Sequence, residues 1–374
     1  MQLSVIILNY NVKHFLELCI KSVQAAIQNL NAEIIVVDNA STDGSKEMMQ
    51  TFFSEITYLY QTENVGFPKG NNIGVKCAKG KYICILNPDT VVAEDTFSRL
   101  LKFAETKEKL GVIGCKLVDG TGSFLPESKR NVPTPKVSLL KMIGKSKAYY
   151  AERLQENQIG QASVFVGAFM FVEKQKYLEL KGFDEDFFMY GEDIDLSYRF
   201  EKNGYENYYF GKTTIIHYKG ESTNKDKVYL QRFYGAMKIF YKKHFKTNFL
   251  FDFAIDLGIK LFSFLGNFKN QPTEKTIPEH YILVSANREL YQKIQQKSTI
   301  PVDWIRSLED VAVLDQPQKQ IEILVDHEIV SFKEYIAFIS KHQKSNKTFK
   351  IKAKQSHFFV GSNDKNNKGA VLSF

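Results

Sequence analysis

The N-terminal part of the chain alternates between continuous apolar runs and segments with helical spacing, and this alternation limits the fold more than any other feature. The apolar runs lie in LSVIILNYN (3–11), AEIIVVDNAS (32–41), ITYLYQTEN (56–64) and KYICILNPDTVV (81–92). Continuous apolar runs are typical of strands that are buried on both faces. The pattern therefore predicts an α/β fold, with a Rossmann-like sheet that has helices on both faces.

Polar residues follow three of these runs, at the point where each strand is expected to end. They are Asn9 to Asn11, Asp38 to Asp43, and Asn87 to Asp89. In open α/β sheets, ligands bind beyond the carboxyl ends of the strands, so we expect a binding site at this edge. An aspartate there can accept a hydrogen bond from a nucleobase or a ribose. Capping of the following helix is the alternative for both Asp38 and Asp43, and it explains Asp43 equally well.

A stretch rich in glycine and asparagine, NVGFPKGNNIGVKCAKG (64–80), leads into a predicted helix. Glycine lets the backbone approach a ligand closely, and a helix N-terminus favours a phosphate group. The stretch matches neither the GxxxxGK phosphate loop nor the GxGxxG fingerprint. It indicates a turn that faces a ligand without identifying that ligand.

Two residues at predicted strand ends suggest a metal site. Asp89 lies in LNPDT, and His217 lies in IIHYKGEST. A carboxylate there can hold a divalent metal that bridges a diphosphate, and Asn87 adds a neutral oxygen. If the two strand ends meet, these groups, diphosphate oxygens and water complete an octahedral site for Mg²⁺ or Mn²⁺, and a histidine ligand favours Mn²⁺. A structural role for His217 stays open.

Three carboxylates, Glu192, Asp193 and Asp195, lie close together in FFMYGEDIDLSYR (187–199). Like charges this close repel each other, but the start of a predicted helix stabilises anions. Asp195 and Arg199 have the i, i+4 spacing of an ion pair, which leaves the other two acids to face a cleft. We assign Asp193 as the general base that deprotonates an acceptor hydroxyl, and Glu192 as the residue that positions this acceptor. A capped helix with surface acids is the alternative.

From about Gly111 the pattern loosens. The segment NFLFDFAIDLGIKLFSFLGNF (248–268) is apolar, but its three charged residues argue against a transmembrane helix. An interfacial amphipathic helix and a core-packed helix both fit. We expect a catalytic domain over 1–245, an amphipathic helical segment over 246–270, and a small α/β module over 271–374 that follows the linker NQPTEKTIPE.

Net charge and cysteine usage limit the kinds of partner and the redox compartment that we expect for the protein. The formal net charge of +8 suits nucleic acid, anionic lipid or phosphorylated ligands, and charge alone does not choose among them. The four cysteines, Cys19, Cys77, Cys84 and Cys115, form no CxxC pair and join no histidine cluster. We therefore expect reduced thiols in a cytoplasmic protein. We expect no signal peptide, because the N-terminus runs directly into a strand.

Taken in order, several of these stretches resemble the inverting family 2 glycosyltransferases of the GT-A fold, particularly a rhamnosyltransferase-like bacterial branch. The matching stretches are VIILNYN, VVDNASTDGS, NVGFPKGNNIG, ILNPDTVV, VGAFMFVEK, GFDEDFFMYGEDIDLSYR and HYKGEST. They are specific as a set, although each is weak alone. The resemblance covers about residues 1–245.

The resemblance implies a role for each matching residue. The residues that it implies for binding of the nucleotide sugar are Asn9, Tyr10, Asn11, Asp38, Asn39, Ser41, Asn64, Gly66, Asn71 and Asn87. It further implies that Asp89 and His217 are metal ligands and that Gly167 and Ala168 lie on the acceptor side. Asn87 replaces the first acid of the DxD metal motif of this family, which weakens the expectation that two carboxylates bind the metal. Since this branch often shows NPD, metal dependence is still expected.

The resemblance implies an inverting transfer of a sugar, with rhamnose as the first choice, from a nucleoside-diphosphate sugar to a hydroxyl group. The expected acceptor is a glycan or a lipid-linked glycan of cell-surface polysaccharide synthesis. We expect peripheral contact with an anionic membrane at the inner face of the plasma membrane, and no nucleic acid partner.

Two other functions stay open. A nucleotidyltransferase acting on sugar phosphates also uses an α/β sheet and a metal-binding aspartate, but LNYNVKHF lacks the basic glycine-rich loop expected after its first strand. A non-catalytic protein that binds nucleotide sugars is the other alternative. The presence of Asp89, Asp193 and His217 together argues against it.

Overall fold

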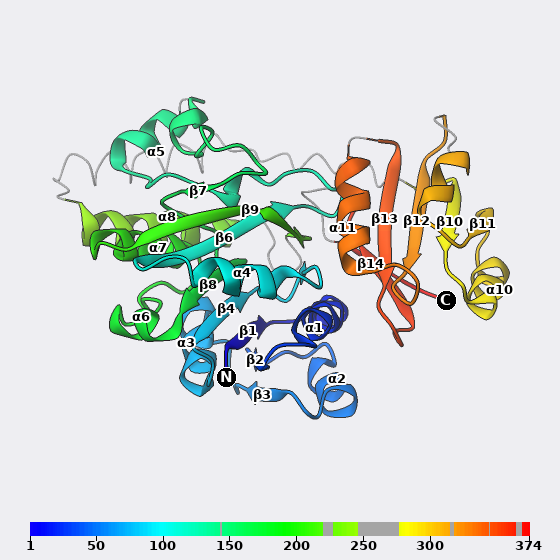
Figure 1. Ribbon diagram of the computed structural model, residues 1–374, viewed down its shortest axis with the longest axis horizontal. Helices are drawn as coiled ribbons and strands as arrows, with labels where there is room; N and C mark the ends of the chain where they lie inside the picture. Colours follow the sequence, from blue (N-terminus) through cyan, green and yellow to red (C-terminus); the bar gives the residue numbers. More distant parts are fainter. Residues whose placement is uncertain (143, 220–226, 246–276, 315–317, 344, 364–368) are drawn as a thin grey trace.

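The N-terminal part of the chain builds one mixed sheet of nine strands (Figure 1). The computed structural model describes every residue except 143, 220–226, 246–276, 315–317, 344 and 364–368. The strands of this sheet are β1 (Leu3–Asn9), β2 (Ala32–Asp38), β3 (Thr57–Tyr60), β4 (Tyr82–Leu86), β5 (Thr90–Val91), β6 (Leu110–Val118), β7 (Ile159–Gln161), β8 (Phe169–Glu173) and β9 (Glu206–His217). Their order is β3-β2-β1-β4-β8-β6-β9-β5, and β7 pairs with β9.

Parallel pairing joins the first four strands, and the later strands add antiparallel pairs. β1 pairs in parallel with both β2 and β4, and β3 pairs in parallel with β2. β8 runs antiparallel to both β4 and β6, and β5 runs antiparallel to the end of β9. The predicted α/β fold with a mixed sheet is confirmed. Because the carboxyl ends of β1, β2 and β4 share one edge, the polar residues that follow them come together there.

The helices of this part cover both faces of the sheet (Figure 1). They are α1 (Lys13–Ile27), α2 (Ser45–Phe52), α3 (Phe67–Cys77), α4 (Thr96–Ala104), α5 (Pro135–Met142), α6 (Lys174–Glu179), α7 (Glu192–Lys202) and α8 (Lys227–His244). Short 3₁₀ turns lie at Pro126–Ser128 and Ser146–Ala148.

The two faces of β1 are buried under different helices. Val5 and Ile7 pack in one apolar cluster with side chains of α1, α2 and α4. Ile6 packs in a second cluster, with Val75 of α3 and Phe200 of α7. Every residue of β1 is buried. This burial on both faces explains why the strand reads as a continuous apolar run and not as an alternating one.

The structure differs from the sequence-based expectation at two points. The run over 81–92 forms two strands, β4 and β5, because the chain turns at Asn87 to Asp89. The sequence pattern predicts no strand over 110–118, yet β6 lies inside the sheet between β8 and β9. Gly111 and Gly114 interrupt the apolar pattern of this strand. Gly114 lets the ring of Phe165 approach, since a Cβ there would lie 2.2 Å from it.

The C-terminal part forms the predicted small α/β module around a second sheet. Its strands follow the order β11-β10-β12-β13-β14-β15. The elements are β10 (His280–Val284), α10 (Arg288–Lys297), β11 (Val302–Ile305), a 3₁₀ helix (Glu309–Leu314), β12 (Ile321–Asp326), α11 (Phe332–Lys341), β13 (Lys347–Lys352), β14 (Phe358–Gly361) and β15 (Ala370–Ser373). The predicted amphipathic segment over 246–270, and the predicted linker up to residue 276, lie outside the described residues.

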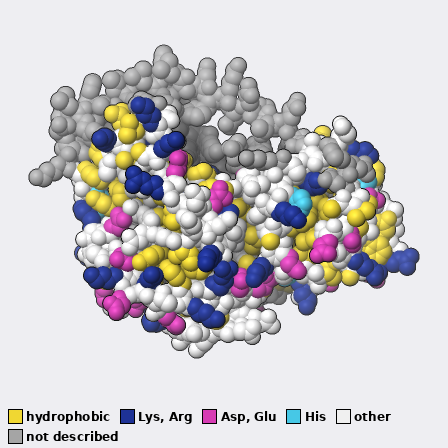
Figure 2. All heavy atoms as spheres, turned by 45° about the horizontal axis from the view of Figure 1, so that its top comes forward, with side chains coloured by type: hydrophobic (Ala, Val, Ile, Leu, Met, Phe, Trp, Pro, Cys, Tyr) yellow, Lys and Arg dark blue, Asp and Glu magenta, His cyan; other side chains and the backbone are white. Residues whose placement is uncertain are grey.

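Charged side chains of both signs are dispersed over the visible surface. Figure 2 shows Lys and Arg interspersed with Asp, Glu and hydrophobic side chains on the described part of one face. Among the described helices, none combines the length and the apolar character that crossing a membrane requires.

Gly74 allows α3 to lie close to the sheet, and we expect its replacement to destabilise the protein. A Cβ at position 74 would lie 2.5 Å from Cγ2 of Ile6 and 3.0 Å from Cγ2 of Val37. Both neighbours are stiff β-branched side chains. We predict that Gly74→Ala lowers the free energy of unfolding by about 1–3 kcal/mol in chemical denaturation.

Gly235 of α8 provides the matched control, because a Cβ there meets no atom within 4 Å. Gly235→Ala gains only the helix propensity of alanine and should raise the free energy of unfolding by up to about 1 kcal/mol. Equal effects of the two substitutions would contradict the close approach of α3 to β1.

Candidate functional site

A buried hydrogen-bond network follows β1 and β2. Asn9 donates through Nδ2 to Asp38 Oδ2 at 2.7 Å and to Ser41 Oγ at 3.0 Å. The amide of Ser41 donates to Asp38 Oδ1 at 2.7 Å, and the amide of Asn11 donates to Ser41 Oγ at 2.9 Å. Asp38 is fully buried, whereas Tyr10 is 37% exposed beside this network. The Asp38 carboxylate therefore holds the two strand-end loops together and leaves the Tyr10 ring at the surface.

Asp43 caps two helices, in agreement with the structural alternative considered for it. Its Oδ2 accepts from the amide of Lys13 at 2.7 Å, and its Oδ1 accepts from the hydroxyl of Ser45 at 2.6 Å. Lys13 and Ser45 begin α1 and α2. The first amides of a helix have no partner inside the helix, so this carboxylate stabilises both helix starts.

The glycine-rich turn contacts the loop that leads into α7. Asn39 donates through Nδ2 to Asn64 Oδ1 at 3.3 Å and to the carbonyl of Gly66 at 3.2 Å. Gly66 has a φ of +85°, and a Cβ there would lie 2.7 Å from the carbonyl oxygen of Phe188. The amide of Phe67 donates to that same oxygen at 2.9 Å. Position 66 therefore requires glycine, both for its backbone conformation and for this close approach.

Three buried amide oxygens at this edge have no hydrogen-bond partner among the described residues. They are Oδ1 of Asn9, Oδ1 of Asn39 and Oδ1 of Asn71. The orientation of Asn71 is fixed, because its Nδ2 donates to the carbonyl of Phe67 at 2.9 Å. A buried acceptor left without a partner costs about 1–3 kcal/mol. These oxygens suit the N–H and hydroxyl groups of a bound nucleoside.

Asp89 and His217 meet because β5 pairs with β9. Thr90 lies opposite His217 in the register, and the amide of Tyr218 donates to the carbonyl of Asp89 at 2.9 Å. Asp89 Oδ1 lies 3.4 Å from His217 Nε2, and Asn87 Nδ2 also lies 3.4 Å from that nitrogen. The two strand ends thus converge, which is the condition that the predicted metal site requires.

This pair fits a metal that is shared with a substrate. Asp89 Oδ1 is buried and has no hydrogen-bond partner among the described residues, and His217 Nε2 is the ring nitrogen that faces it. The described part of the chain contains no group of three His, Cys, Asp or Glu side chains that could hold a metal. One carboxylate and one imidazole leave most of an octahedral shell to water and to phosphate oxygens, as is usual for Mg²⁺ sites with nucleotides.

A short segment before β8 links this pair to the acids of α7. The amide of Asn87 donates to the carbonyl of Ala168 at 3.0 Å, and the amide of Gly167 donates to Asp193 Oδ2 at 3.1 Å. A Cβ at Gly167 would lie 3.3 Å from the ring of Phe67 and 3.6 Å from Cβ of Asp193. The small size of Gly167 thus lets α3 and α7 approach the segment from two sides.

Asp193 forms a buried ion pair with Arg130. Arg130 Nη2 donates to Asp193 Oδ2 at 2.7 Å and to the carbonyl of Phe165 at 2.8 Å. Asp193 Oδ1 accepts from the amide of Ile194 at 2.8 Å. Burial lowers the pKa of Arg130, but Asp193 and Tyr149 together outweigh it and raise this pKa overall. A carboxylate offers about four lone-pair sites, so one on Oδ1 remains for a hydroxyl group.

Glu192 lies next to Asp193 but, unlike Asp193, forms no ion pair with Arg130. It is 5% exposed, and its Oε2 has no hydrogen-bond partner among the described residues. Burial, and then the charge of Asp193, raise the pKa of Glu192 well above its usual range. Burial therefore disfavours the charged form of Glu192, and its protonated form would donate a hydrogen bond. The cation beside this pair of acids is Arg130, which bonds to Asp193.

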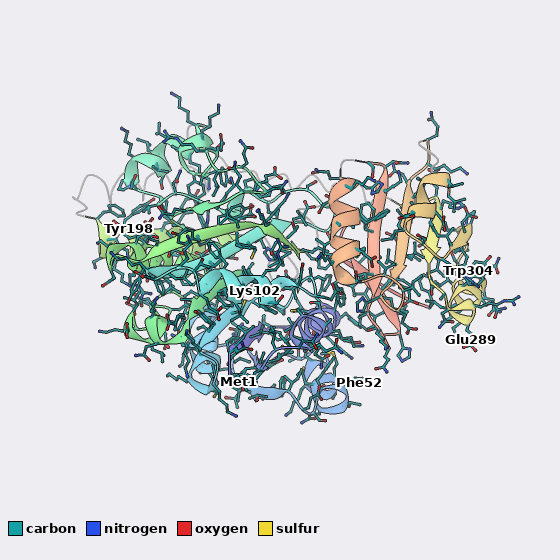
Figure 3. All side chains as sticks on the ribbon, viewed as in Figure 1. Met1, Phe52, Lys102, Tyr198, Glu289 and Trp304 are labelled. Atoms are coloured by element: carbon teal, nitrogen blue, oxygen red, sulfur yellow. The ribbon has the colours of Figure 1, made fainter. Side chains whose placement is uncertain are left out.

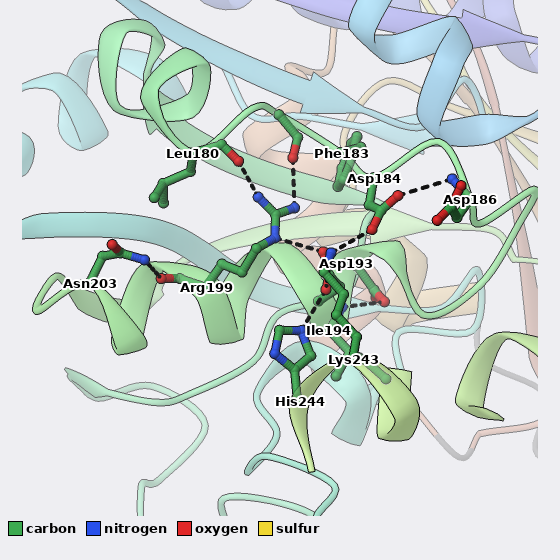
Figure 4. Close-up of polar contacts among 12 residues, drawn as sticks. Leu180, Phe183, Asp184, Asp186, Asp193, Ile194, Arg199, Asn203, Lys243 and His244 are labelled. Atoms are coloured by element: carbon green, nitrogen blue, oxygen red, sulfur yellow. Dashed lines mark hydrogen bonds and ion pairs between the residues drawn. The ribbon is translucent and has the colours of Figure 1, made fainter. Parts of the chain in front are cut away.

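Asp195 anchors the start of α7 through ionic contacts with three side chains. Its Oδ2 accepts from Arg199 Nε at 2.7 Å, which is the ion pair that the sequence predicts. Its Oδ1 lies 2.6 Å from His244 Nε2 and 2.9 Å from Lys243 Nζ. Figure 4 shows Arg199, Lys243 and His244 converging at the start of α7. Burial raises the pKa of Asp195, but the His244 hydrogen bond and the Arg199 charge outweigh it and lower this pKa to about 2.

Residues 4–179 match the family model described as Glycosyl transferase family 2. This chain carries a family 2 glycosyltransferase domain. The match covers both strand-end loops, the glycine-rich turn, Asp89, and the Gly167 to Ala168 segment that contacts Asp193.

Two similar proteins are rhamnosyltransferases by name. N-acetylglucosaminyl-diphospho-decaprenol L-rhamnosyltransferase of Mycobacterium tuberculosis is 25% identical over 244 residues, which are 60% of this chain and 78% of that protein. Rhamnosyltransferase WbbL of Escherichia coli is 29% identical over 211 residues, 52% of this chain and 78% of that protein. Among solved structures, mannosyltransferase PcManGT of Pyrobaculum calidifontis with GDP-Man and Mn²⁺ aligns with a TM-score of 0.47 and 18% identity, over 71% of this chain and 70% of that one.

Sequence reasoning about this glycosyltransferase domain did not find Arg130. The partner of Arg130, Asp193, is 63 positions further along the chain. The stretch ESKRNVP around Arg130 has neither the strand pattern nor the helix pattern that would place it in a site. A buried ion pair between distant segments leaves no local spacing signal, so only the folded chain reveals it.

Because Asp195 ties α7 of the glycosyltransferase domain to α8, we expect Asp195→Asn to destabilise the protein. A folded-state pKa of about 2 against the ordinary 3.8 corresponds to about 2–3 kcal/mol at neutral pH. This stabilisation is present above the unfolded pKa and is lost as the pH falls from about 4 towards 2. Denaturation of both proteins at several pH values should show that their difference shrinks over that range.

Asp184→Asn serves as the control for this experiment. Asp184 pairs with Lys243 at a partly exposed position, and exposed pairs contribute about 1 kcal/mol or less. If Asp195→Asn is no more destabilising than this control, Asp195 does not anchor α7.

Proposed function

We propose that this domain transfers a sugar from a nucleoside-diphosphate sugar to a hydroxyl of a glycan or lipid-linked acceptor, with inversion at the anomeric carbon. One observation carries the proposal. The amide of Asn87, beside the Asp89 and His217 pair, donates a hydrogen bond to the carbonyl of Ala168. The amide of the adjacent Gly167 donates a hydrogen bond to Asp193 Oδ2. A donor diphosphate at one end of this segment and an acceptor hydroxyl at the other would therefore meet across it.

The strand-end network would hold the nucleoside. The unpartnered oxygens of Asn9, Asn39 and Asn71 would accept hydrogen bonds from the base and the ribose. The exposed Tyr10 ring would cover an apolar face of this ligand. We take dTDP-rhamnose as the first choice of donor, because both relatives named above are rhamnosyltransferases.

Asp89 and His217 would hold a divalent cation, Mn²⁺ or Mg²⁺, with Asn87 at their side. When bound there, the cation supplies positive charge that offsets the charge of the leaving diphosphate. The dipole of α3 adds to this effect, because the start of a helix favours anionic groups.

Asp193 would take the proton of the acceptor hydroxyl at Oδ1, where one lone pair remains. Arg130 and the amide of Gly167 keep the other oxygen in place, so the carboxylate is oriented before the acceptor arrives. Glu192, whose pKa is raised by burial, would donate a hydrogen bond in its protonated form and so position this acceptor. The acceptor oxygen then attacks the anomeric carbon from the side opposite the diphosphate, and the configuration inverts without a covalent intermediate on the protein.

We further propose that the acceptor is lipid-linked and that the protein works at the cytoplasmic face of the plasma membrane in cell-surface polysaccharide synthesis. The support is the name of one relative, which acts on a diphospho-decaprenol acceptor. The amphipathic segment proposed for peripheral contact with anionic lipid, over 246–270, lies outside the described residues.

A thermal-shift screen tests the donor class. We expect one of dTDP, UDP, GDP and CDP, or a sugar conjugate of it, to raise the melting temperature, and Mn²⁺ to increase that shift. A ligand at 100 times its Kd stabilises the folded state by about 2.7 kcal/mol. Asp89→Asn should reduce the increase due to Mn²⁺ and leave the metal-free shift unchanged. No shift with any nucleotide would count against a nucleotide-sugar donor.

The role of Asp193 is tested by comparing Asp193→Asn with Glu192→Gln. General bases contribute about 10²–10⁴-fold to rates, so Asp193→Asn should reduce turnover by at least 10²-fold, while dTDP or UDP still shifts the melting temperature. Glu192→Gln keeps an uncharged hydrogen-bond donor and should lose far less. Turnover that survives in Asp193→Asn would assign the base elsewhere.

A further inference from the structure

The C-terminal module packs against the strand pair that carries Asp89 and His217. Val91 of β5, Ile216 of β9 and Tyr218 share one apolar cluster with the module. The module contributes to this cluster the buried side chains Val330, Phe332, Tyr335, Ile336 and Ile339. Figure 1 shows α11 between the strands of the module and the end of β9. Asp89 and His217 therefore lie on one side of the short β5–β9 strand pair, and the module lies on the other side.

The pairing of β5 with β9, which we call the ladder, is short, so its geometry depends on the side chains that pack around it. β5 contains two residues and is the last strand in the order of the large sheet. Its pairing with β9 consists of Thr90 with His217 and Val91 with Ile216. β9 is a long strand that also pairs with β6, whereas β5 lies at the end of the described sheet and is held further by α1, where the Val92 amide donates to Ser22 Oγ at 3.2 Å. The packing of Val91, Ile216 and Tyr218 therefore contributes to the geometry of the ladder.

A carboxylate just after β5 fixes the ladder to the start of α11. Glu94 Oε1 accepts from the amide of Phe332 at 2.7 Å, and Glu94 Oε2 accepts from the amide of Lys333 at 2.9 Å. The third amide of this helix, that of Glu334, is satisfied by the Ser331 hydroxyl at 3.2 Å. The helix start therefore uses a group from the glycosyltransferase domain as part of its own cap.

Two further contacts fix the position of the module. Ser356 donates to Glu17 of α1 at 2.6 Å, and Lys21 donates to the carbonyl of Lys354 at 2.8 Å. Gly122, with a φ of +81°, lies against α11, since a Cβ there would lie 2.1 Å from the carbonyl oxygen of Ile339. Together with Glu94, these contacts hold the module at three separate points of the glycosyltransferase domain.

We infer that the C-terminal module positions Asp89 and His217, because its helix α11 forms the surface that keeps β5 and β9 paired. Ile336 and Glu94 are then positioning residues that act through the ladder and do not touch the substrate. The inference rests on the proposed function in one respect, namely that Asp89 and His217 hold the metal.

Amide hydrogen exchange of the full-length protein tests the ladder directly and needs no ligand. Exchange reports local opening, and an amide that loses its partner exchanges faster. We expect Ile336→Ala, which truncates a side chain that is 3% exposed, to speed exchange in peptides covering 88–93 and 213–219 by about fivefold or more. Glu94→Gln removes the charge at the helix start without opening a cavity, and it should act in the same direction.

Ile294→Ala is the matched control. Ile294 is fully buried in α10 and belongs to the apolar cluster on the opposite face of the module sheet. In Figure 3, Glu289 and Trp304 mark this far end of the module. The control truncates the same residue type in the same module without touching the ladder. We expect Ile294→Ala to leave exchange in 88–93 and 213–219 unchanged. An increase equal to that of Ile336→Ala would show that the module only stabilises the protein as a whole, and it would overturn the inference.

Titration with Mn²⁺ and dTDP, or UDP, separates this inference from the proposed function. Ile336→Ala and Glu94→Gln should weaken the Mn²⁺-dependent part of nucleotide binding several-fold, and Ile294→Ala should not. Normal exchange and normal binding in both ladder variants would overturn the inference. The wild-type protein could also bind no nucleotide while the two ladder variants still exchange faster than it does. That result would support the positioning of Asp89 and His217 by the module and refute the proposed function.

Discussion

Burial of β1 on both faces is the constraint on which the rest of the site depends. A strand with helices above and below, and with strands on both sides, leaves a ligand no access to its middle. Functional groups are therefore confined to the point where the strand ends, at Asn9 and beyond. The same holds for β2 and β4, so Asp38 and Asn87 are brought to one edge. The site is thus a consequence of how the core excludes water.

The three neighbouring acids at the start of α7 avoid mutual repulsion because each meets a different environment. Asp195 is surrounded by the cations of α7 and α8, which stabilise its charge. Asp193 is compensated by Arg130. Glu192 has neither a cation of its own nor much exposure to water, so burial raises its pKa. One helix turn thus places three acids in three environments, and their order in the chain alone does not assign these environments.

The packing of the C-terminal module against the glycosyltransferase domain changes where a structural boundary between the two can be drawn. By sequence it follows the catalytic part as a separate unit, yet its helix α11 shares an apolar cluster with β5 and β9 and takes a cap from Glu94. Truncation between the two parts would expose Tyr218, which directly follows His217. The packed unit that contains Asp89 and His217 therefore extends beyond the residues that match the family model.

Local patterns determined the mixed α/β sheet, the positions of most strands and helices, and the candidate residues at strand ends, because burial and turn chemistry act on neighbours in the chain. The tertiary structure decided what local patterns cannot encode. It decided that Asp89 meets His217 through a two-residue ladder, that β6 passes through the sheet despite its glycines, and that Asp43 accepts hydrogen bonds from the starts of α1 and α2. It also supplied Arg130, because an ion pair between distant segments depends on long-range packing and leaves no periodicity in the sequence.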